Sequence, residues 1–391
     1  MSQVPAPTVD KHPFDWLTLL QFGSSGFALA SGLTTALGLA VAAAFVPRAS
    51  SLDGLVQLSS LLGILAAALL LLPSTYYALR RILGKPGAVF RPYGRAFAFS
   101  ILALPLCIGA SYLALEARLD WLVALLYLGP AILVVAWLAW LALRKLGPLS
   151  AQRIWGGLAA GLIGVTSFSL ALEAVAGVVV LAGLAVYVQV TPELTRAIEA
   201  LLQASENLDD VSLLAPFMND PVILLTGLFS LSAVAPLVEE FFKPLAVVLL
   251  LRRPLTPAQG FALGALSGAG FALAENLFLS APAETLAVAV AGRAGASAMH
   301  VLTGALAGLA LVQARQQRRY VRLLGIYLLN VVIHAVWNGL VLLSAAGAVT
   351  LAAAEGLVPA AFAMIGPVLL VGLGSTCILA IWRINQRLQP N

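Results

Sequence analysis

The stretch Pro236-Leu237-Val238-Glu239-Glu240-Phe241-Phe242-Lys243-Pro244 lies inside a long apolar run, at about residues 222–251. About 20 apolar residues suffice to cross a bilayer, so this run is long enough to be a transmembrane helix. Each charged side chain at the centre of such a helix costs about 2.5–3.5 kcal/mol on insertion scales. Charges kept within a membrane usually face a bundle interior or a water-filled cavity, so the stretch indicates a functional site inside a membrane protein.

The spacing within this stretch predicts an ion pair and a break in the helix. Glu239 precedes Lys243 by four residues, which is the favoured order for a helical ion pair, and Glu240 is also within reach. Lys243 can neutralise one carboxylate and leave the other available. Pro236 and Pro244 each remove a backbone donor, so we expect a kink with polar backbone exposed, which is tolerated only inside protein or beside water. A salt bridge that only fixes packing is the alternative, but it leaves the second carboxylate unexplained.

The composition of the whole chain is that of a membrane protein. Of 391 residues, 61% are hydrophobic and only 10% are charged, whereas a soluble domain has about 25% charged residues. The mean hydropathy is +0.98. The net charge of +5 is not a nucleic-acid signal, because the basic residues fall in short loops between apolar runs. The two cysteines, Cys107 and Cys377, lie in apolar runs and are expected to be small core residues.

Ten apolar runs predict an all-α, polytopic transmembrane helix bundle with about ten spans. The runs lie at about 19–46, 52–77, 97–115, 121–143, 154–190, 222–251, 259–281, 293–313, 323–345 and 359–382. The first run is too long for the apolar part of a cleaved signal peptide, so we expect an anchor. The fifth run is long for one helix and short for two, and the pattern of charged loops decides between them.

Basic residues are distributed unequally between the two sides of the predicted bundle. With the N-terminus inside, the inner segments hold Lys11, Arg80, Arg81, Lys85, Arg91, Arg95, Arg144, Lys145, Arg153, Arg252, Arg253, Arg315, Arg318, Arg319, Arg322, Arg383 and Arg387. The outer segments hold Arg48, Arg118, Arg196 and Arg293. This inner excess predicts that both termini are cytoplasmic, in a protein of the cytoplasmic membrane. The basic loops after residue 190 fall on the inner side only if residues 154–190 cross the membrane once, so we expect one long, tilted or bent helix there.

The spans and loops divide the chain into five predicted regions. These are a cytoplasmic tail (1–18), an N-terminal five-span region (19–190), an acidic extracytoplasmic loop (191–221), the motif-bearing helices (222–345), and a last span with a cytoplasmic tail (346–391). The loop carries Glu193, Glu199, Glu206, Asp209, Asp210 and Asp220. Its stretch Pro192–Leu202 is predicted to be an amphipathic helix, either a lid or a connector. Glu173, in the fifth span, is expected in a polar pocket or near the outer interface.

Polar residues recur at helical spacing in the last five spans. The stripes are Gly260, Gly264 and Gly268 with Glu275 seven residues further on; Ala296, His300, Gly304 and Gly308; and Asn330, His334 and Asn338. Small residues at four-residue spacing predict close helix packing. Because positions seven apart share a helix face, Glu275 is expected to point toward neighbouring helices rather than lipid.

Together these groups offer the parts of a hydrolytic site. Glu239 or Glu240 could act as general base, with imidazoles to polarise or donate, and a carboxamide to bind an oxyanion. The same groups also resemble a zinc site with a carboxylate base, whose candidate ligands are Glu240, Glu275, His300 and His334. A metal-free glutamate–histidine mechanism is the alternative.

Counting along the spans places these groups at one depth. At about 1.5 Å per residue from the inner loops, the predicted depths run from roughly 18 Å to roughly 25 Å in a hydrocarbon core of about 30 Å. The residues counted are Glu240, His334, His300, Asn338 and Glu275. Groups from four spans at one level predict one shared site, which water reaches from outside.

The motifs Glu239-Glu240-x-x-Lys243, Phe271-x3-Glu275-Asn276, His300 and His334-x3-Asn338 resemble those of PrsW-type intramembrane proteases, which are related to type II CAAX prenyl proteases. The resemblance covers about residues 222–345. It implies cleavage of a membrane-anchored protein, in the type member an anti-sigma factor, with Glu239 as base. The residues implied as catalytic are Glu239, Glu240, His300, His334 and Asn338, with Lys243, Glu275 and Asn276 in support. The sequence departs from the CAAX-protease pattern in two places. Lys243 lies three residues after the second glutamate, where those enzymes usually have an arginine four residues after it, and Glu275 stands where they have a histidine. Both departures favour the PrsW branch.

Two other functions fit parts of the pattern. A transporter could relay protons or cations through buried carboxylates, although the polarity lies in one half of the chain and no inverted repeat is visible. A scaffold subunit could retain the motifs without catalysis. The expected partners are a membrane-anchored protein substrate and the lipid bilayer, with no nucleic acid and no nucleotide.

Overall fold

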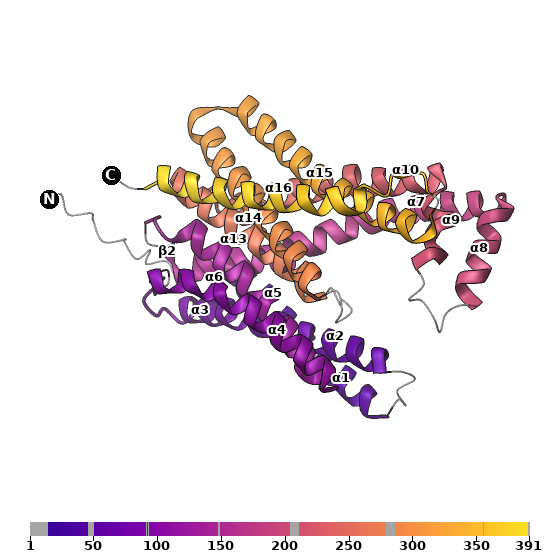
Figure 1. Ribbon diagram of the computed structural model, residues 1–391. Helices are drawn as coiled ribbons and strands as arrows, with labels where there is room; N and C mark the ends of the chain where they lie inside the picture. The colour runs from indigo at the N-terminus through magenta and orange to yellow at the C-terminus, as the bar shows by residue number, and fades with distance from the viewer. Residues whose placement is uncertain are drawn as a thin grey trace. The chain divides into compact units, whose positions relative to one another are not determined.

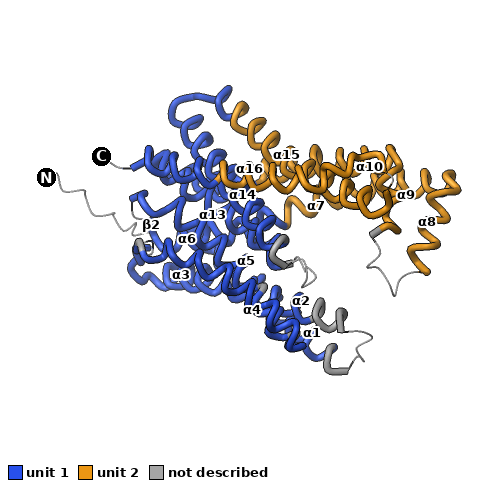
Figure 2. Tube along the Cα trace, viewed as in Figure 1, with its two compact units in different colours: residues 1–166, 243–323, 378–391 blue, residues 167–242, 324–377 orange. Residues whose placement is uncertain are grey.

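The computed structural model describes residues 15–45, 51–90, 92, 94–147, 149–203, 211–278, 286–354 and 356–389. Among these residues the strands are limited to one short antiparallel pair and nearly everything else is helix, so the predicted all-α architecture is confirmed. The chain forms two compact units (Figure 2). Unit 1 comprises residues 1–166, 243–323 and 378–391, and unit 2 comprises residues 167–242 and 324–377.

Unit 1 contains the helices of the first part of the chain and the two helices that carry the glycine stripes (Figure 1). Its helices are α1 (Trp16–Phe45), α2 (Ser51–Leu70), α3 (Leu72–Ile82), the 3₁₀-helix η1 (Arg95–Leu102), α4 (Ala103–Glu116), α5 (Asp120–Leu143), α6 (Ala151–Ala159), the π-helix η2 (Ala160–Val165), α12 (Leu245–Leu250), α13 (Pro257–Phe278) and α14 (Leu286–Gln317). Its strands are β1 (Val89–Phe90) and β2 (Leu149–Ser150).

Helix α13 packs against several neighbours in unit 1 because its small residues let their backbones approach. A Cβ on Gly264 would overlap the carbonyl oxygen of Gly304 in α14, and one on Gly268 would overlap the carbonyl oxygen of His300. Gly270 lies equally close to the backbone of α6 and η2. The predicted stripes on the two helices are therefore confirmed, and they face each other.

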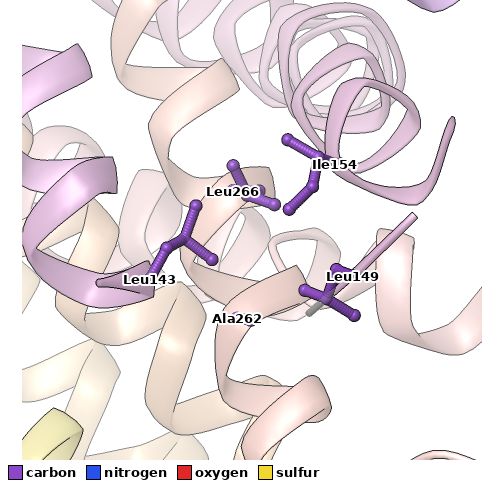
Figure 3. Packing of buried hydrophobic residues seen from close by; sticks show 5 residues of the cluster. All are labelled: Leu143, Leu149, Ile154, Ala262 and Leu266. Atoms are coloured by element: carbon purple, nitrogen blue, oxygen red, sulfur yellow. The ribbon is translucent and has the colours of Figure 1, made fainter. Parts of the chain in front are cut away.

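Apolar side chains fill the space around the same helix. In one cluster, Ala262 and Leu266 of α13 pack with Leu143 of α5, Leu149 of β2 and Ile154 of α6 (Figure 3). A second cluster joins α13 to α12 and α14. Nearly every side chain of α13 is buried as a result.

Nine helices within the described residues are long and apolar enough to cross a membrane. The remaining predicted span coincides with α13, which is 22 residues long but includes Gly, Ser, Gln, Asn and Glu. A helix enclosed by other helices does not need the apolar surface that lipid contact demands. The composition of α13 therefore follows from its enclosed place in unit 1.

Several contacts in unit 1 join segments that the sequence assigns to the inner side. Strands β1 and β2 pair two successive inner loops. Arg253 donates to Asp15 at 2.5 Å, and Gln316 donates to the carbonyl oxygen of Leu255 at 2.6 Å. Lys145 donates to the side chain of Gln386. These contacts agree with the phase of the predicted spans, while the orientation of the bundle stays a prediction.

Unit 2 is formed by the second part of the long fifth span, the acidic loop, most of the sixth span and parts of the last two spans. Its helices are α7 (Thr166–Gln189), α8 (Pro192–Gln203), the 3₁₀-helix η3 (Val211–Leu214), α9 (Ala215–Met218), α10 (Pro221–Phe229), the π-helix η4 (Ser230–Val234), α11 (Ala235–Phe242), and most of α15 (Tyr320–Ala353) and α16 (Phe362–Arg387). Two sequence predictions are confirmed here. The run Ala151–Gln189 is one continuous helical span that includes η2, and the acidic loop contains a helix at Pro192–Gln203.

Side-chain contacts fix the ends of the helices in unit 2. Asp220 accepts from the backbone amides of Val222 and Ile223 at 2.9 Å each, which caps α10. Tyr187 of α7 donates to the same carboxylate at 2.9 Å.

Some residues of the sequence analysis lie outside the described residues, namely most of the tail 1–18 with Lys11, and Arg48, Arg91, Glu206, Asp209 and Asp210.

Candidate active site

The motif stretch is interrupted on both sides, as its prolines predict. Before Pro236 the helix takes π geometry in η4, in which an amide would donate to the carbonyl five residues earlier. Pro236 has no N–H, so the carbonyl of Leu231 lacks its π-helical donor. Asn338 of α15 supplies one instead, because its Nδ2 donates to the Leu231 oxygen at 2.7 Å. After α11 the chain turns at Lys243 and Pro244, which separates α11 from α12.

In unit 2 the two glutamates of the motif meet the histidine of α15. The Nδ1 atom of His334 lies 3.0 Å from Oε1 of Glu240, within hydrogen-bond distance. The Nε2 atom of His334 lies 3.7 Å from Oε2 of Glu239. All three side chains are almost fully buried, with 2%, 0% and 8% exposed for His334, Glu240 and Glu239.

This cluster gives the two carboxylates different environments. When Glu240 is ionised, Nδ1 of His334 carries the hydrogen and donates it, so the lone pair of a neutral ring lies on Nε2. The Nε2 side faces Glu239 at a distance beyond an ordinary hydrogen bond. Glu240 therefore fixes the orientation of the ring, and Glu239 faces the nitrogen that carries the lone pair.

Asn338 lies one helical turn beyond His334, as the polar stripe predicts. One N–H of its carboxamide is used by the Leu231 carbonyl. A carboxamide has two N–H groups, so a role toward an oxyanion would fall to the second. Tyr327, a residue that the sequence analysis missed, donates from its hydroxyl to the carbonyl of Leu237 at 2.9 Å on the same motif stretch.

In unit 1, Lys243 is enclosed between α13 and α14. Its Nζ lies 3.5 Å from Oγ1 of Thr303 and 5.4 Å from the ring centroid of Phe271. The same ring meets His300 edge to face, with centroids 5.1 Å apart. Lys243 is fully buried, so its ammonium is held by an aromatic face and a hydroxyl within this unit.

A second carboxylate–histidine cluster lies between α13 and α14. Nε2 of His300 lies 2.8 Å from Oε2 of Glu275, and His300 is 2% exposed. Arg293 donates to the same carboxylate oxygen at 2.9 Å and to Oδ1 of Asn276 at 2.7 Å. The prediction that Glu275 points toward neighbouring helices is confirmed.

Arg293 is the residue for which the sequence analysis was wrong. We expected it in an outer loop, but it lies inside α14, within the candidate span Ala289–Gln317. The charge is tolerated there because Glu275 and Asn276 accept its hydrogen bonds. A signal was present in the sequence, since Arg293 precedes His300 by seven residues and so shares its helix face.

The predicted residues thus gather in two clusters, one in each unit. Unit 2 brings together Glu239, Glu240 and His334, with Asn338 on the neighbouring turn. Unit 1 brings together Glu275, Asn276 and His300, with Lys243 near the same helices.

Buried carboxylate–imidazole clusters in a polytopic helical protein point to a hydrolase that works inside the membrane. The sequence matches the PrsW family intramembrane metalloproteases over residues 150–366, which is more than half of the chain and includes every predicted site residue. The chain therefore belongs to this family and is a peptide hydrolase of the membrane. No curated protein and no solved structure matches the chain.

Proposed function

We propose that the chain cleaves a membrane-anchored protein within its span, using water activated by Glu239 together with His334 and His300. The observation that carries this proposal is the geometry around His334. One of its ring nitrogens is held by Glu240 at 3.0 Å, and the other faces Glu239 at 3.7 Å in a buried setting. A buried carboxylate beside an oriented imidazole is the arrangement that general acid–base hydrolysis needs.

The family is one of metalloproteases, and the residues fit a metal. Two atoms bound to a tetrahedral zinc at about 2.1 Å are separated by about 3.4 Å, close to the 3.7 Å between Nε2 of His334 and Oε2 of Glu239. We therefore propose that Glu239 and His334 of unit 2 would hold a zinc ion, with Glu240 orienting His334. His300 stays a further candidate ligand from the sequence, and Glu275 holds its Nε2 atom within unit 1. A bound zinc ion would polarise the peptide carbonyl and lower the pKa of water.

The chain's own residues then move the protons. In the metal-free alternative, the carboxylate of Glu239 takes a proton from water, whose oxygen bonds to the peptide carbonyl carbon. The same proton goes to the amide nitrogen as the C–N bond breaks, which releases an amine and a carboxylic acid. Glu240 keeps the imidazole of His334 in one tautomer throughout, because it holds Nδ1.

The substrate is proposed to be a single-pass protein cut near the extracytoplasmic end of its span. The support is the sequence depth of the motif residues, which places them at mid-depth to the outer third of the membrane. An anti-sigma factor is a candidate substrate because the resemblance implies one. Mass spectrometry of the products tests the position, and a cut mapped to the cytoplasmic end would contradict it.

The activity is tested by comparing membrane proteins in cells that carry the wild type or Glu239→Gln. We expect at least one membrane protein to lose a fragment only in the wild type. Glu173→Gln is a matched control, since it removes a carboxylate of α7 outside the cluster and should leave the fragment unchanged. A partner that is lost in cells lacking the chain, yet accumulates intact beside Glu239→Gln as beside the wild type, would favour a scaffold instead. Ion-coupled uptake by proteoliposomes without any cleavage would favour a transporter.

A further inference from the structure

Arg293 is an arginine inside a candidate membrane span, and its guanidinium donates to two side chains of α13. Its Nη2 donates to Oε2 of Glu275 at 2.9 Å, and its Nε donates to Oδ1 of Asn276 at 2.7 Å. An arginine in a membrane span is costly unless its charge is compensated by partners inside the protein. Arg293 lies near the end of its span, and an ion pair and a second acceptor compensate for its charge.

The surroundings compensate the charge of the guanidinium and also fix its orientation. Asn276 donates through Nδ2 to Oγ of Ser297 at 3.0 Å and to the carbonyl oxygen of Ala131 at 3.3 Å. Ser297 donates in turn to the carbonyl oxygen of Arg293 at 2.6 Å. These bonds hold the carboxamide with its oxygen toward Arg293, so the guanidinium has one preferred orientation.

The same carboxylate oxygen also meets His300. Oε2 of Glu275 lies 2.9 Å from Nη2 of Arg293 and 2.8 Å from Nε2 of His300. The backbone of His300 is fixed independently, because its carbonyl lies against Gly268 of α13. The remaining freedom of the ring is its rotation and its tautomer, and Glu275 constrains both.

We propose that Arg293 is a positioning residue that acts through Glu275 on His300. Its guanidinium holds the carboxylate at the place where it accepts the Nε2 hydrogen of the imidazole, which leaves the lone pair on Nδ1. The planar fork of arginine matters here, since it binds Glu275 and Asn276 at once, and a lysine offers a point charge on a flexible stem. This positioning role is argued from the contacts of Arg293 and Glu275. The proposed function adds only that the lone pair on Nδ1 of His300 is used in the reaction.

The tautomer of His300 can be observed directly because the chain has three histidines, His12, His300 and His334. We suggest ¹⁵N-histidine labelling of the metal-stripped full chain in lipid bilayers, with solid-state NMR of the ring nitrogens. The His300 resonances are assigned by their loss in His300→Gln. We expect the wild type to show a single His300 tautomer with hydrogen on Nε2, and Arg293→Gln to show a mixture.

Two further variants make the result specific. Arg293→Lys keeps the charge and loses the fork, so we expect shifted or broadened His300 resonances, and this variant decides if Arg293→Gln does not accumulate. Arg253→Gln removes another ion-paired arginine of unit 1, the partner of Asp15, and should leave His300 unchanged. The His334 resonances report on unit 2 and should be the same in every variant. Unchanged His300 resonances in the variant that accumulates would overturn the proposal.

A kinetic readout follows once a substrate is found. Loss of a residue that orients a catalytic histidine lowers activity about 10–100-fold, and we expect Arg293→Gln to lower kcat by that factor with little change in KM. The NMR result needs no substrate and no metal. His300 resonances that shift in Arg293→Gln, in a chain without any proteolysis, would therefore support the positioning role and reject the proposed function. Proteolysis with unchanged His300 resonances would support the proposed function and reject the positioning role.

Discussion

The two histidine clusters are placed by opposite means. In unit 1, His300 lies on a regular helix that touches α13 backbone to backbone at Gly264 and Gly268. In unit 2, His334 meets glutamates on a helix broken by η4, Pro236 and the turn at Lys243. Close packing of straight helices fixes the first cluster, whereas side chains that repair an irregular backbone fix the second. The residues of one family motif are thus held by a rigid support in unit 1 and by an interrupted helix in unit 2.

The largest expected effect comes from breaking the rigid support. In Gly268→Leu, the new side chain would overlap the carbonyl of His300, which is backbone and cannot move aside. Overpacking costs about 1–3 kcal/mol, and occasionally more, even where side chains can adjust. We expect loss of folded protein, measured by thermal unfolding in detergent, while Gly292→Leu on α14, where a Cβ meets open space, should fold normally.

The next effect concerns Glu239 and His334, the proposed catalytic residues of the unit 2 cluster. Glu239→Gln and His334→Ala should each lower cleavage by about 10²–10⁴-fold, the range for loss of general acid–base catalysis. His300→Ala should abolish cleavage as well, since both clusters are proposed to contribute. Protein accumulation in the membrane is the control, and full activity in any of the three would contradict the assignment.

Metal content separates ligands from orienting residues. We expect about one zinc ion per chain in the wild type, measured on purified protein, and loss of that zinc in Glu239→Gln and His334→Ala. Glu240→Gln should retain zinc with affinity lowered about 10–100-fold, as for other residues that orient a metal-binding histidine. In the metal-free alternative, thoroughly stripped enzyme would keep its activity.

The smallest effect should come from removing the hydrogen bond that Asn338 makes to the interrupted helix. Asn338→Ala removes the donor to the Leu231 carbonyl, and hydrogen bonds between membrane helices contribute about 0.6–2 kcal/mol. We expect a modest fall in thermal stability with the unit 2 cluster intact. A loss of activity as large as that of His334→Ala, without loss of stability, would show instead that Asn338 binds the oxyanion.

Much of the rigid cluster could be predicted from the sequence, because its signals are local. Glycines at four-residue spacing predicted the contact face of α13, and a seven-residue step placed Glu275 on it. The histidine stripe on the facing helix followed in the same way. Arg293 was missed because a charge at the edge of an apolar run is typical of a loop, and only its partners on α13 show otherwise.

The interrupted cluster was less predictable, since its geometry depends on distant residues. The prolines predicted a break, but the bond of Asn338 to Leu231 spans 107 residues. No local pattern marks a π-helix, and the different roles of Glu239 and Glu240 follow from which nitrogen of His334 each one meets. The catalytic roles themselves stay predictions until activity is measured.

The π-helix η4 also has an angular consequence. A π turn accommodates one more residue than an α turn, and each residue of an α-helix advances about 100° around the axis. Everything after residues 230–234 is therefore rotated relative to α10, compared with an uninterrupted α-helix. Deleting one residue there would swing Glu239 and Glu240 by about a quarter turn while leaving every side chain of the motif chemically unaltered. The direction of both carboxylates is thus encoded in the number of residues before them, a property that no scan of single substitutions would reveal.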